Sequence, residues 1–347
     1  MKKSILLPIF LIIAHSVVMG QKSSQHAFQF LNLAASPRVA AIGGSFLPLA
    51  DNDLMLALHN PALINADMHN HLGLTFLDHY AGISAGNVVY GRNFEKYGSF
   101  LGGIRFMHYG NFQRTDPTGM DQGSFTASDL ALTLGWGRAL YPGLRLGADL
   151  NIILSNYDVW SSFALAADVS GHYTNQSGLF QASLLVRNAG RQIDRYAVER
   201  EDLPFDIAAG ISQKLKHAPI RFFVLLNTLH HWDLTYEDPL NPSFTTDPIT
   251  GEIQQPGEVV SFLDKAMRHV IVGMELMPGE MFRLRLGYDY RTRQEAGVRT
   301  KMGNVGFSWG LGLKLGKYQF DFSRTRNHIA GAPNYFSIRT DLSAFGK

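Results

Sequence analysis

The amino-acid sequence predicts an all-β fold, namely a 14-stranded antiparallel transmembrane β-barrel with an N-terminal hatch. Hydrophobic residues make up 46% of the chain and charged residues only 17%, whereas a soluble protein usually has about 25% charged residues. Beyond the first twenty residues, however, no apolar run reaches the roughly 18 residues of a membrane helix. Apolar and polar residues instead alternate in glycine-rich segments, as in strands that face lipid on one side and a polar lumen on the other.

The N-terminus has the pattern of a secretory signal peptide. Two lysines precede an apolar run over 5–18, and Gly20 offers a small residue for cleavage. Because this run is shorter than the about 20 residues of a comfortable membrane span, a retained anchor is the weaker alternative. We therefore expect a signal peptide at 1–20, a hatch at 21–70 and an outer-membrane β-barrel at 71–347, in a protein exported to the outer membrane.

Fourteen segments of the sequence alternate with a period of two. A strand needs about 9 to 11 residues to cross a bilayer at a tilt, and most of these segments are at least that long. Strands of a soluble β-sandwich, the alternative fold, average only ~5 to 6 residues. The segments are 71–78, 83–94, 98–109, 124–140, 143–156, 161–173, 178–189, 205–216, 219–232, 269–277, 281–291, 303–315, 318–326 and 334–342.

Charge assigns the two faces of these segments. In the fifth segment, Leu150 and other apolar residues alternate with Asp149 and Asn151. A charge that faced lipid at mid-bilayer would cost about 2 to 4 kcal/mol, so the charged face is predicted to line the lumen. The same alternation places Val305 of the twelfth segment on the lipid face. We expect the lumenal charges to brace the barrel as ion pairs; they include Arg105, Arg145, Asp149, Asp168, Arg187, Asp206, Arg221, Glu275, Arg283, Arg285, Asp289 and Asp321.

The connections between segments give an independent test of the barrel. Outer-membrane barrels join their strands by short turns on the periplasmic side and by longer loops outside. Short turns are predicted at 95–97, 141–142, 174–177, 217–218, 278–280 and 316–317. Longer connections are predicted at about 110–123, 190–204, 233–268, 292–302 and 327–333, with brief exceptions near 79–82 and 157–160. An even number of strands then leaves both termini in the periplasm.

One early stretch, residues 34–63, does not alternate. It contains many small residues, a Gly43-Gly44 pair, an Asn60-Pro61 turn and a short helical phase around residues 54–58. Glycine permits close backbone packing, and an Asn-Pro pair favours a fixed turn. We therefore interpret this stretch as a plug that folds inside the barrel.

No motif in the sequence supports catalysis, a metal site or nucleic-acid binding. The string at 82–86 matches the G-x-S-x-G nucleophile elbow, but it opens a strand with no helix behind it. Residues 51–53 begin like a calcium loop but lack its Gly and Glu, so a solvated or helix-capping turn is expected. His230 and His231 would point to opposite faces of a strand, and we interpret them as rim histidines. We expect no cofactor, no metal and no nucleic acid.

The longest connection, at 233–268, is a candidate partner loop. It exceeds the about 12 to 15 residues above which loops tend to be functional or disordered, and a short helix is expected over 261–267. Its apolar residues have no strand to hide them, so they must cover the barrel mouth as a lid or meet a partner. The candidate partner residues are Phe244, Ile249, Ile253, Phe262 and Leu263.

The early stretch also carries a family resemblance. Its order of 36–44, then 50–53, then 60–63 resembles the N-terminal hatch of the FadL-like outer-membrane proteins, whose barrels have fourteen strands. The hatch-motif residues are Arg38, Gly43, Gly44, Asp51, Asp53, Asn60 and Pro61. Within that superfamily the chain is similar to the PorQ family of the type IX secretion system. That similarity rests on the strings 30–33, 203–207, 210–212, 216–222 and 232–234.

This resemblance implies a non-catalytic role in a surface attachment complex that contains PorU, PorV, PorZ and PorQ. PorQ holds the surface protein PorZ at the outer membrane, and PorU processes and attaches the secreted cargo. The implied partners are a PorZ-like surface protein, PorU/PorV-like members of the attachment complex and outer membrane lipid. The alternative is a FadL-type channel or transporter for small hydrophobic molecules. Such a transporter should present an apolar groove into the lumen and a gap in the wall.

Overall fold

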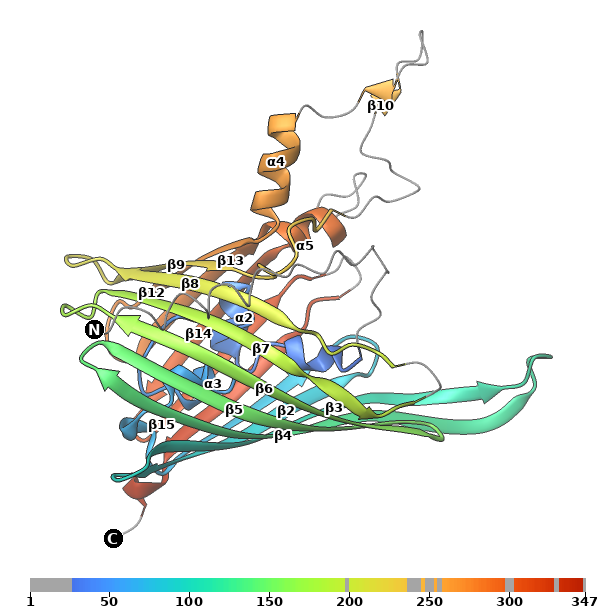
Figure 1. Ribbon diagram of the computed structural model, residues 1–347, viewed down its shortest axis with the longest axis horizontal. Coiled ribbons are helices and arrows are strands. Elements are labelled where there is room, and N and C mark those ends of the chain that lie inside the picture. Colours follow the sequence, from blue (N-terminus) through green and yellow to red (C-terminus); the bar gives the residue numbers. More distant parts are fainter. Residues whose placement is uncertain are drawn as a thin grey trace, which may run out of the picture.

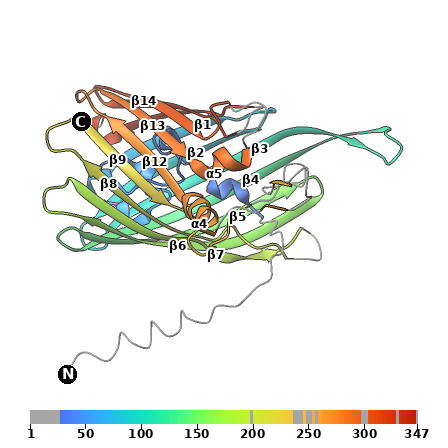
Figure 2. The same cartoon turned by 90° about the horizontal axis from the view of Figure 1, so that it is seen from above.

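The wall of the molecule is a closed antiparallel β-barrel (Figures 1 and 2). The structure, a computed structural model, describes residues 27–196, 200–235, 245–246, 253–254, 258–296, 303–327 and 331–345. Fourteen of the described strands form the barrel, and its seam is closed by β1 (His71–Asp78) pairing with β16 (Asn334–Asp341). The predicted fourteen-stranded antiparallel barrel is confirmed. The predicted signal peptide at 1–20 lies outside the described residues.

Between β1 and β16, each wall strand pairs with the strand before it and the strand after it, and the long connection between β9 and β12 forms a separate small sheet. The remaining wall strands are β2 (Ser84–Phe94), β3 (Gly98–Thr115), β4 (Asp121–Tyr141), β5 (Leu144–Tyr157), β6 (Trp160–Thr174), β7 (Phe180–Asp194), β8 (Asp206–Lys214), β9 (Ile220–Leu226), β12 (Val270–Leu276), β13 (Phe282–Asp289), β14 (Phe307–Leu315) and β15 (Tyr318–Thr325). The small sheet is β10 (Thr245–Thr246) with β11 (Ile253–Gln254).

The helices are short and fall into three groups. Those that precede β1 are η1 (Gln29–Asn32), α2 (Pro37–Ile42), α3 (Leu54–Ala57), η2 (Pro61–Leu63) and η3 (Ala66–Met68). Those at the ends of the longer connections are α4 (Glu258–Met267) and α5 (Tyr290–Ala296), and η4 (Leu342–Ala344) follows the last strand. Among the described residues, no helix has the length and apolarity needed to cross a bilayer.

The strands face as the charge pattern predicts. In β5 the side chain of Leu150 is 44% exposed on the outside, and that of Asn151 is 0% exposed on the inside. In β13, Leu286 is exposed outside and Arg285 is buried inside. Leu74, Phe106, Leu134 and other apolar residues cover the outer surface, which is the surface that lipid would contact.

The end of the barrel that carries the longer connections differs from the prediction in three places. Residues 110–123, predicted as a loop, belong mostly to β3 and β4, which pair only with each other beyond His108 and Ala127. Their projecting hairpin (Figure 1) escaped the pattern because its side chains are almost all polar or exposed, so it has no apolar face. β9 ends at Leu226 rather than at 232, because Thr228 takes a positive φ of 57° and turns the chain.

The third difference concerns the start of β14. This strand begins at Phe307 rather than at 303, because Gly306 has a φ of 86° and redirects the backbone. Val305, predicted to face lipid, is therefore buried at 1% exposure. At the other end of the β13–β14 connection, β13 ends at Asp289 and α5 begins at the next residue.

The segment ahead of β1 runs through the lumen. Helix α2 contacts β13, β14 and β15, and η2 contacts β4, β5 and β6 (Figure 1). The start of β1 and the end of β16 both lie at the short-turn end, where His71 pairs with Asp341. This is the end that was predicted to face the periplasm. The first described residue, Ala27, lies at the opposite end of the barrel. Its amide donates to the Asp202 carbonyl in the β7–β8 connection. Residues 27–70 thus extend along the lumen from the long-loop end to the short-turn end.

Candidate functional site: the occupied lumen

Local sequence shapes α2 and directs Arg38 toward the wall. Ser36 caps the helix by accepting the Val39 amide at 3.4 Å, and Pro37 occupies the first turn, where its missing N–H is not needed. Arg38 is only 6% exposed. Its guanidinium donates to Asp51 at 2.6 Å and to Asp53 at 3.2 Å, both within the N-terminal segment.

The same guanidinium joins this segment to the barrel wall. Arg38 Nη2 lies 3.2 Å from Glu275 of β12, and Glu275 accepts from Arg285 of β13 at 2.8 Å. Arg285 also pairs with Asp321 of β15 at 2.6 Å. A buried charge is tolerated when it is paired and hydrogen-bonded. The predicted bracing by ion pairs is therefore present, but it extends into the N-terminal segment, which the sequence pattern did not reveal.

A second arginine completes this network from β16. Arg339 lies 2.5 Å from Asp53, and Asp53 also caps α3 by accepting the Met55 amide at 3.1 Å. Asp53 is 3% exposed, so the predicted helix-capping turn is found, although in a buried and ion-paired setting rather than a solvated one. We call Arg38, Asp51, Asp53, Glu275, Arg285, Asp321 and Arg339 the lumen network.

The glycine pair allows the end of α2 to lie against the wall. Gly43 ends the helix with a φ of 83°, a conformation that costs glycine little. Gly44 faces β9 so closely that an added Cβ would lie 2.4 Å from a methyl carbon of Leu225. Gly43 and Gly44 therefore allow the close backbone packing that the sequence pattern suggested.

Asn60 and Pro61 contact the other side of the barrel. Asn60 is 0% exposed and donates from Nδ2 to Ser183 of β7 at 3.0 Å. The next amide, of Ala62, donates to Ser170 of β6 at 2.8 Å. Arg145 of β5 donates to the Ala62 carbonyl at 3.0 Å. The hatch-motif residues thus divide between two opposite sectors of the wall.

Glycines on the wall are the functional residues that sequence reasoning missed. A Cβ at Gly147 of β5 would lie 2.1 Å from the Pro61 carbonyl carbon, and one at Gly287 of β13 would lie 2.1 Å from that of Ile42. Glycine at a lumen-facing strand position marks a close approach of another backbone. The signal was therefore present in the sequence, as glycines that alternate with apolar residues.

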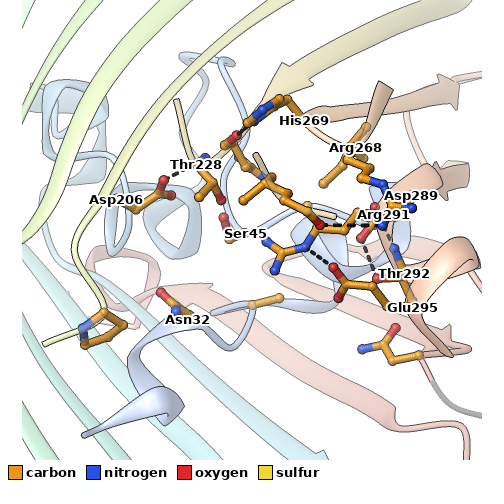
Figure 3. A pocket seen from close by; sticks show the side chains of 18 of the residues that line it. Asn32, Ser45, Asp206, Thr228, Arg268, His269, Asp289, Arg291, Thr292 and Glu295 are labelled. Carbon is orange, nitrogen blue, oxygen red and sulfur yellow. Dashed lines mark hydrogen bonds and ion pairs between the residues drawn. The ribbon is translucent and has the colours of Figure 1, made fainter. Parts of the chain in front are cut away.

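Above the N-terminal segment, at the long-loop end, lies a cavity of about 1000 Å³ that is lined by both polar and apolar side chains (Figure 3). Asn32 and Ser45 belong to its floor, and Asp206, Thr228 and His269 line its side. Several of its polar groups are engaged by other parts of the protein. Asp206 accepts from Arg187 and from the Thr228 amide, and His269 bonds to the Asn227 carbonyl at 2.8 Å. We call this space the mouth cavity.

A smaller cavity of about 510 Å³ lies at the short-turn end. It is lined by Arg38, Arg285 and Arg339 of the lumen network and by Arg283 and Lys314. Charged side chains line both cavities, and the cavities are separated by a segment whose apolar side chains, such as Ile42, Phe46 and Leu56, are buried. Neither has the character of an apolar groove that leads into the lumen.

Of the candidate partner residues, Phe244 and Ile249 lie outside the described residues, and Ile253 is described only as part of β11. Phe262 and Leu263 lie on α4 and are 58% and 56% exposed. That these residues bind a protein partner stays a prediction. Within the described ranges, no group of three or more His, Asp or Glu side chains is arranged to hold a metal ion.

Comparison with known proteins was made on sequence and on structure. No protein-family model matches the chain, and no curated protein matches it. The toluene transporter TbuX of Ralstonia pickettii matches with a TM-score of 0.55 at 11% identity, over 90% of this chain and 99% of TbuX. The toluene transporter TodX of Pseudomonas putida gives a TM-score of 0.52 at 10% identity, over 89% and 96%. The monoaromatic hydrocarbon channel CymD gives 0.50 at 11% identity, over 89% and 98%.

The chain has the fold of these barrels. The likeness spans nearly the whole length of this chain and of each neighbour. A likeness at this level of identity shows the fold alone.

Proposed function

We propose that the protein is a non-catalytic outer-membrane anchor whose lumen is closed and whose extracellular side holds a surface protein. The occupied lumen is the observation that carries this proposal. A hydrophobic solute that crossed the lumen from one end to the other would have to pass the lumen network, where Glu275 and Arg285 are each 1% exposed. Opening that path would separate buried charges from their partners, which costs several kcal/mol per ion.

The residue resemblance to the PorQ family supports the process, which is attachment of type IX secretion cargo to the cell surface. The partner would be a PorZ-like surface protein, alongside PorU/PorV-like members of the complex. On the extracellular side, the β3–β4 hairpin projects furthest from the barrel (Figures 1 and 2). Its turn is held by Asp116, whose side chain accepts the amides of Thr118 and Met120. A projection whose turn is already held in one conformation loses less entropy when it engages a partner.

Transport of small hydrophobic molecules is the second candidate function. It is supported by the likeness to TbuX, TodX and CymD, and these comparisons favour it more directly than they favour the anchor. Against it stands the chemistry of this chain's own lumen, in which charged side chains line both of the cavities described above.

Two measurements on the same cells separate these functions. In the first, the tagged protein is purified from native outer membranes and its co-purifying proteins are identified, for the unaltered chain and for a variant in which 111–125 is replaced by a short Gly/Ser turn. The anchor predicts a surface protein that is retained by the unaltered chain and lost by the variant. In the second, uptake of labelled toluene is compared between cells with and without the protein. Uptake that depends on the protein, with no protein partner recovered, would establish the transporter instead.

A further inference from the structure

The two sides of the barrel wall differ in height. On one side β3 to β7 have 14 to 21 residues, whereas β9 and β12 have 7 residues each. A strand needs about 9 to 11 residues to cross a bilayer at a tilt. The short strands therefore end before a membrane of ordinary thickness does.

The outer face of the tall side shows where the apolar band stops. Phe106, Leu130 and Leu154 pair across three neighbouring strands and form its last apolar row on the outside. Two residues further along, His108, Ser128 and Asn156 form a paired row that is polar. The tall strands thus continue past the lipid-facing surface into water.

The short side has no such polar row. The outward residues of β9 are apolar up to its last residue, Leu226, which pairs with Val270, the first residue of β12. The apolar outer surface therefore extends to the very ends of these strands, with no polar row beyond it. Whatever follows these strands directly lies at the level of lipid.

Helix α4 directly precedes β12. Figure 1 shows it leaving the wall roughly perpendicular to the strands, and Figure 2 shows the same helix end-on, so it extends outward from the barrel rather than over its mouth. This direction is parallel to a membrane that surrounds the barrel. An interfacial helix lies in that plane, with its apolar face turned into the acyl chains.

The polar side of α4 is attached to the protein. Asp264 accepts from Tyr290 at 2.7 Å and from Arg268 at 2.7 Å. Lys265 pairs with Asp233 at 2.7 Å. These contacts fix the helix by its charged residues, which is the reverse of a helix that packs its apolar stripe on a protein core.

The apolar side of α4 is turned away from the protein. Val259, Val260, Phe262, Leu263 and Met267 are between 41% and 72% exposed. Their positions repeat at spacings of three and four residues, which places them on one face of the helix. The ring of Trp232 lies beside that of Phe262, with centroids 5.5 Å apart and the planes tilted by 38°, and Trp232 is itself 52% exposed. Tryptophan at such a position is typical of a membrane interface.

We propose that α4 is an interfacial helix whose apolar face enters the outer leaflet of the membrane, where it continues the lipid-facing surface above β9 and β12. This inference assigns Phe262 and Leu263 to lipid instead of to a protein partner. It requires only that the barrel spans a membrane, and it does not depend on the anchor function.

The chain contains no cysteine, so single-cysteine variants can be labelled at one site each. Phe262→Cys and Leu263→Cys report on the apolar face, and Ser261→Cys is the matched control on the polar side of the same helix. Leu150→Cys is the lipid reference, and Met120→Cys at the hairpin tip, 67% exposed, is the water reference. Each labelled protein is reconstituted into phosphatidylcholine and phosphatidylglycerol vesicles. Quenching of an environment-sensitive dye is measured with a nitroxide lipid and with iodide.

At 262 and 263 we expect nitroxide quenching within about twofold of the Leu150 site and well above the Met120 and Ser261 sites, with iodide quenching reduced accordingly. Iodide quenching like that of the Met120 site would place the face in water and overturn the proposal. Protection from both quenchers would show that the helix packs over the mouth, and would overturn it equally. The assay contains no partner protein, so its result is independent of whether the anchor function holds.

Discussion

Single side chains decide whether the lumen is closed, and Glu275 is central among them. It is 1% exposed and lies between Arg38 of the N-terminal segment and Arg285 of the wall. Removing its charge leaves two buried guanidinium groups without this carboxylate. We expect Glu275→Gln to reduce the free energy of unfolding by about 3 to 5 kcal/mol, measured by denaturant titration of the refolded barrel.

The matched control is Glu295→Gln, which removes the same charge from an exposed pair. Arg291 and Glu295 are 40% and 33% exposed, and such pairs contribute about 0 to 1 kcal/mol. Equal losses for the two variants would mean that the lumen network does not stabilise the barrel.

Leu150 tests the outer face. It is 44% exposed on β5, so Leu150→Arg should cost about 2 to 4 kcal/mol in a bilayer. The natural lumenal comparison, Asn151→Arg, is unsuitable because Asn151 is 0% exposed and bonded to Arg105 and Thr133. Asn156→Arg is the better control, since it lies on the same face of the same strand beyond the apolar band. Refolding into lipid vesicles should therefore tolerate Asn156→Arg, and a larger loss there than at Leu150 would show that the band is misplaced.

The contact between Asp233 and Lys265 makes the attachment of α4 to the protein depend on pH. The hydrogen bond from Lys265 is the main reason that the pKa of Asp233 is lowered to about 2. A carboxyl group whose pKa is lowered by folding stabilises the folded state above its ordinary pKa of about 3.9, and this contribution is lost as the pH falls through the lowered value. We expect a dye at position 262 to keep its signal down to pH about 4 and to change between about 4 and 2. An unchanged signal in Asp233→Asn across that range is the expected control, and a change at neutral pH would contradict the assignment.

At the scale of elements, the period of two was enough to place all fourteen wall strands. It worked best where one face meets lipid, as in β5, because Leu150 and Asp149 must then lie on opposite sides. It failed where neither face is apolar. The hairpin tip between Asn111 and Thr126 is held by backbone pairing and the Asp116 turn, and the alternation of apolar and polar residues does not record such contacts.

The N-terminal segment depends on glycines that belong to other elements. Gly147→Val would drive a side chain into the backbone of Pro61, so we expect residues 34–63 to become severalfold more sensitive to protease in the intact barrel. Gly102→Val is the control, because no heavy atom lies within 4 Å of a Cβ built there. Limited proteolysis followed by mass spectrometry reads out both. Rapid cleavage throughout 34–63 in the unaltered protein would mean that this segment is not held in the lumen.

For the whole molecule, the occupied lumen predicts that ions do not pass through the barrel. A fourteen-stranded wall is wide enough to enclose a channel if nothing fills it. We expect the unaltered protein to show no steady ion conductance in planar bilayers, and a variant that lacks 27–64 to conduct. A steady conductance of similar size in both would show that the segment does not close the lumen.

The closed lumen could be foreseen only in part. The unpatterned stretch and its glycine pair indicated a plug, because strands of the wall need alternation and this stretch has none. The partners of Arg38 could not be foreseen, because Glu275 lies 237 residues away and any lumenal carboxylate would satisfy the same pattern. The orientation of α4 was equally hidden. Its amphipathic sequence is the same whether its apolar face meets the barrel, a partner or lipid, and it is the heights of β9 and β12 together with the direction and contacts of the helix that favour lipid.

The span of the lumen contacts along the chain also sets the order of assembly. Arg38 bonds to Glu275, and the Ala41 carbonyl accepts from Ser308 across 267 residues. Contacts between such distant residues form late, because the intervening chain must first be brought together. In a chain that is exported as the sequence predicts, we therefore expect the N-terminal segment to emerge first and to be buried last, when β12 to β16 complete the wall and β16 joins β1. Until that moment it is open to periplasmic chaperones and proteases, so a chain truncated before β12 should be degraded from its N-terminal end.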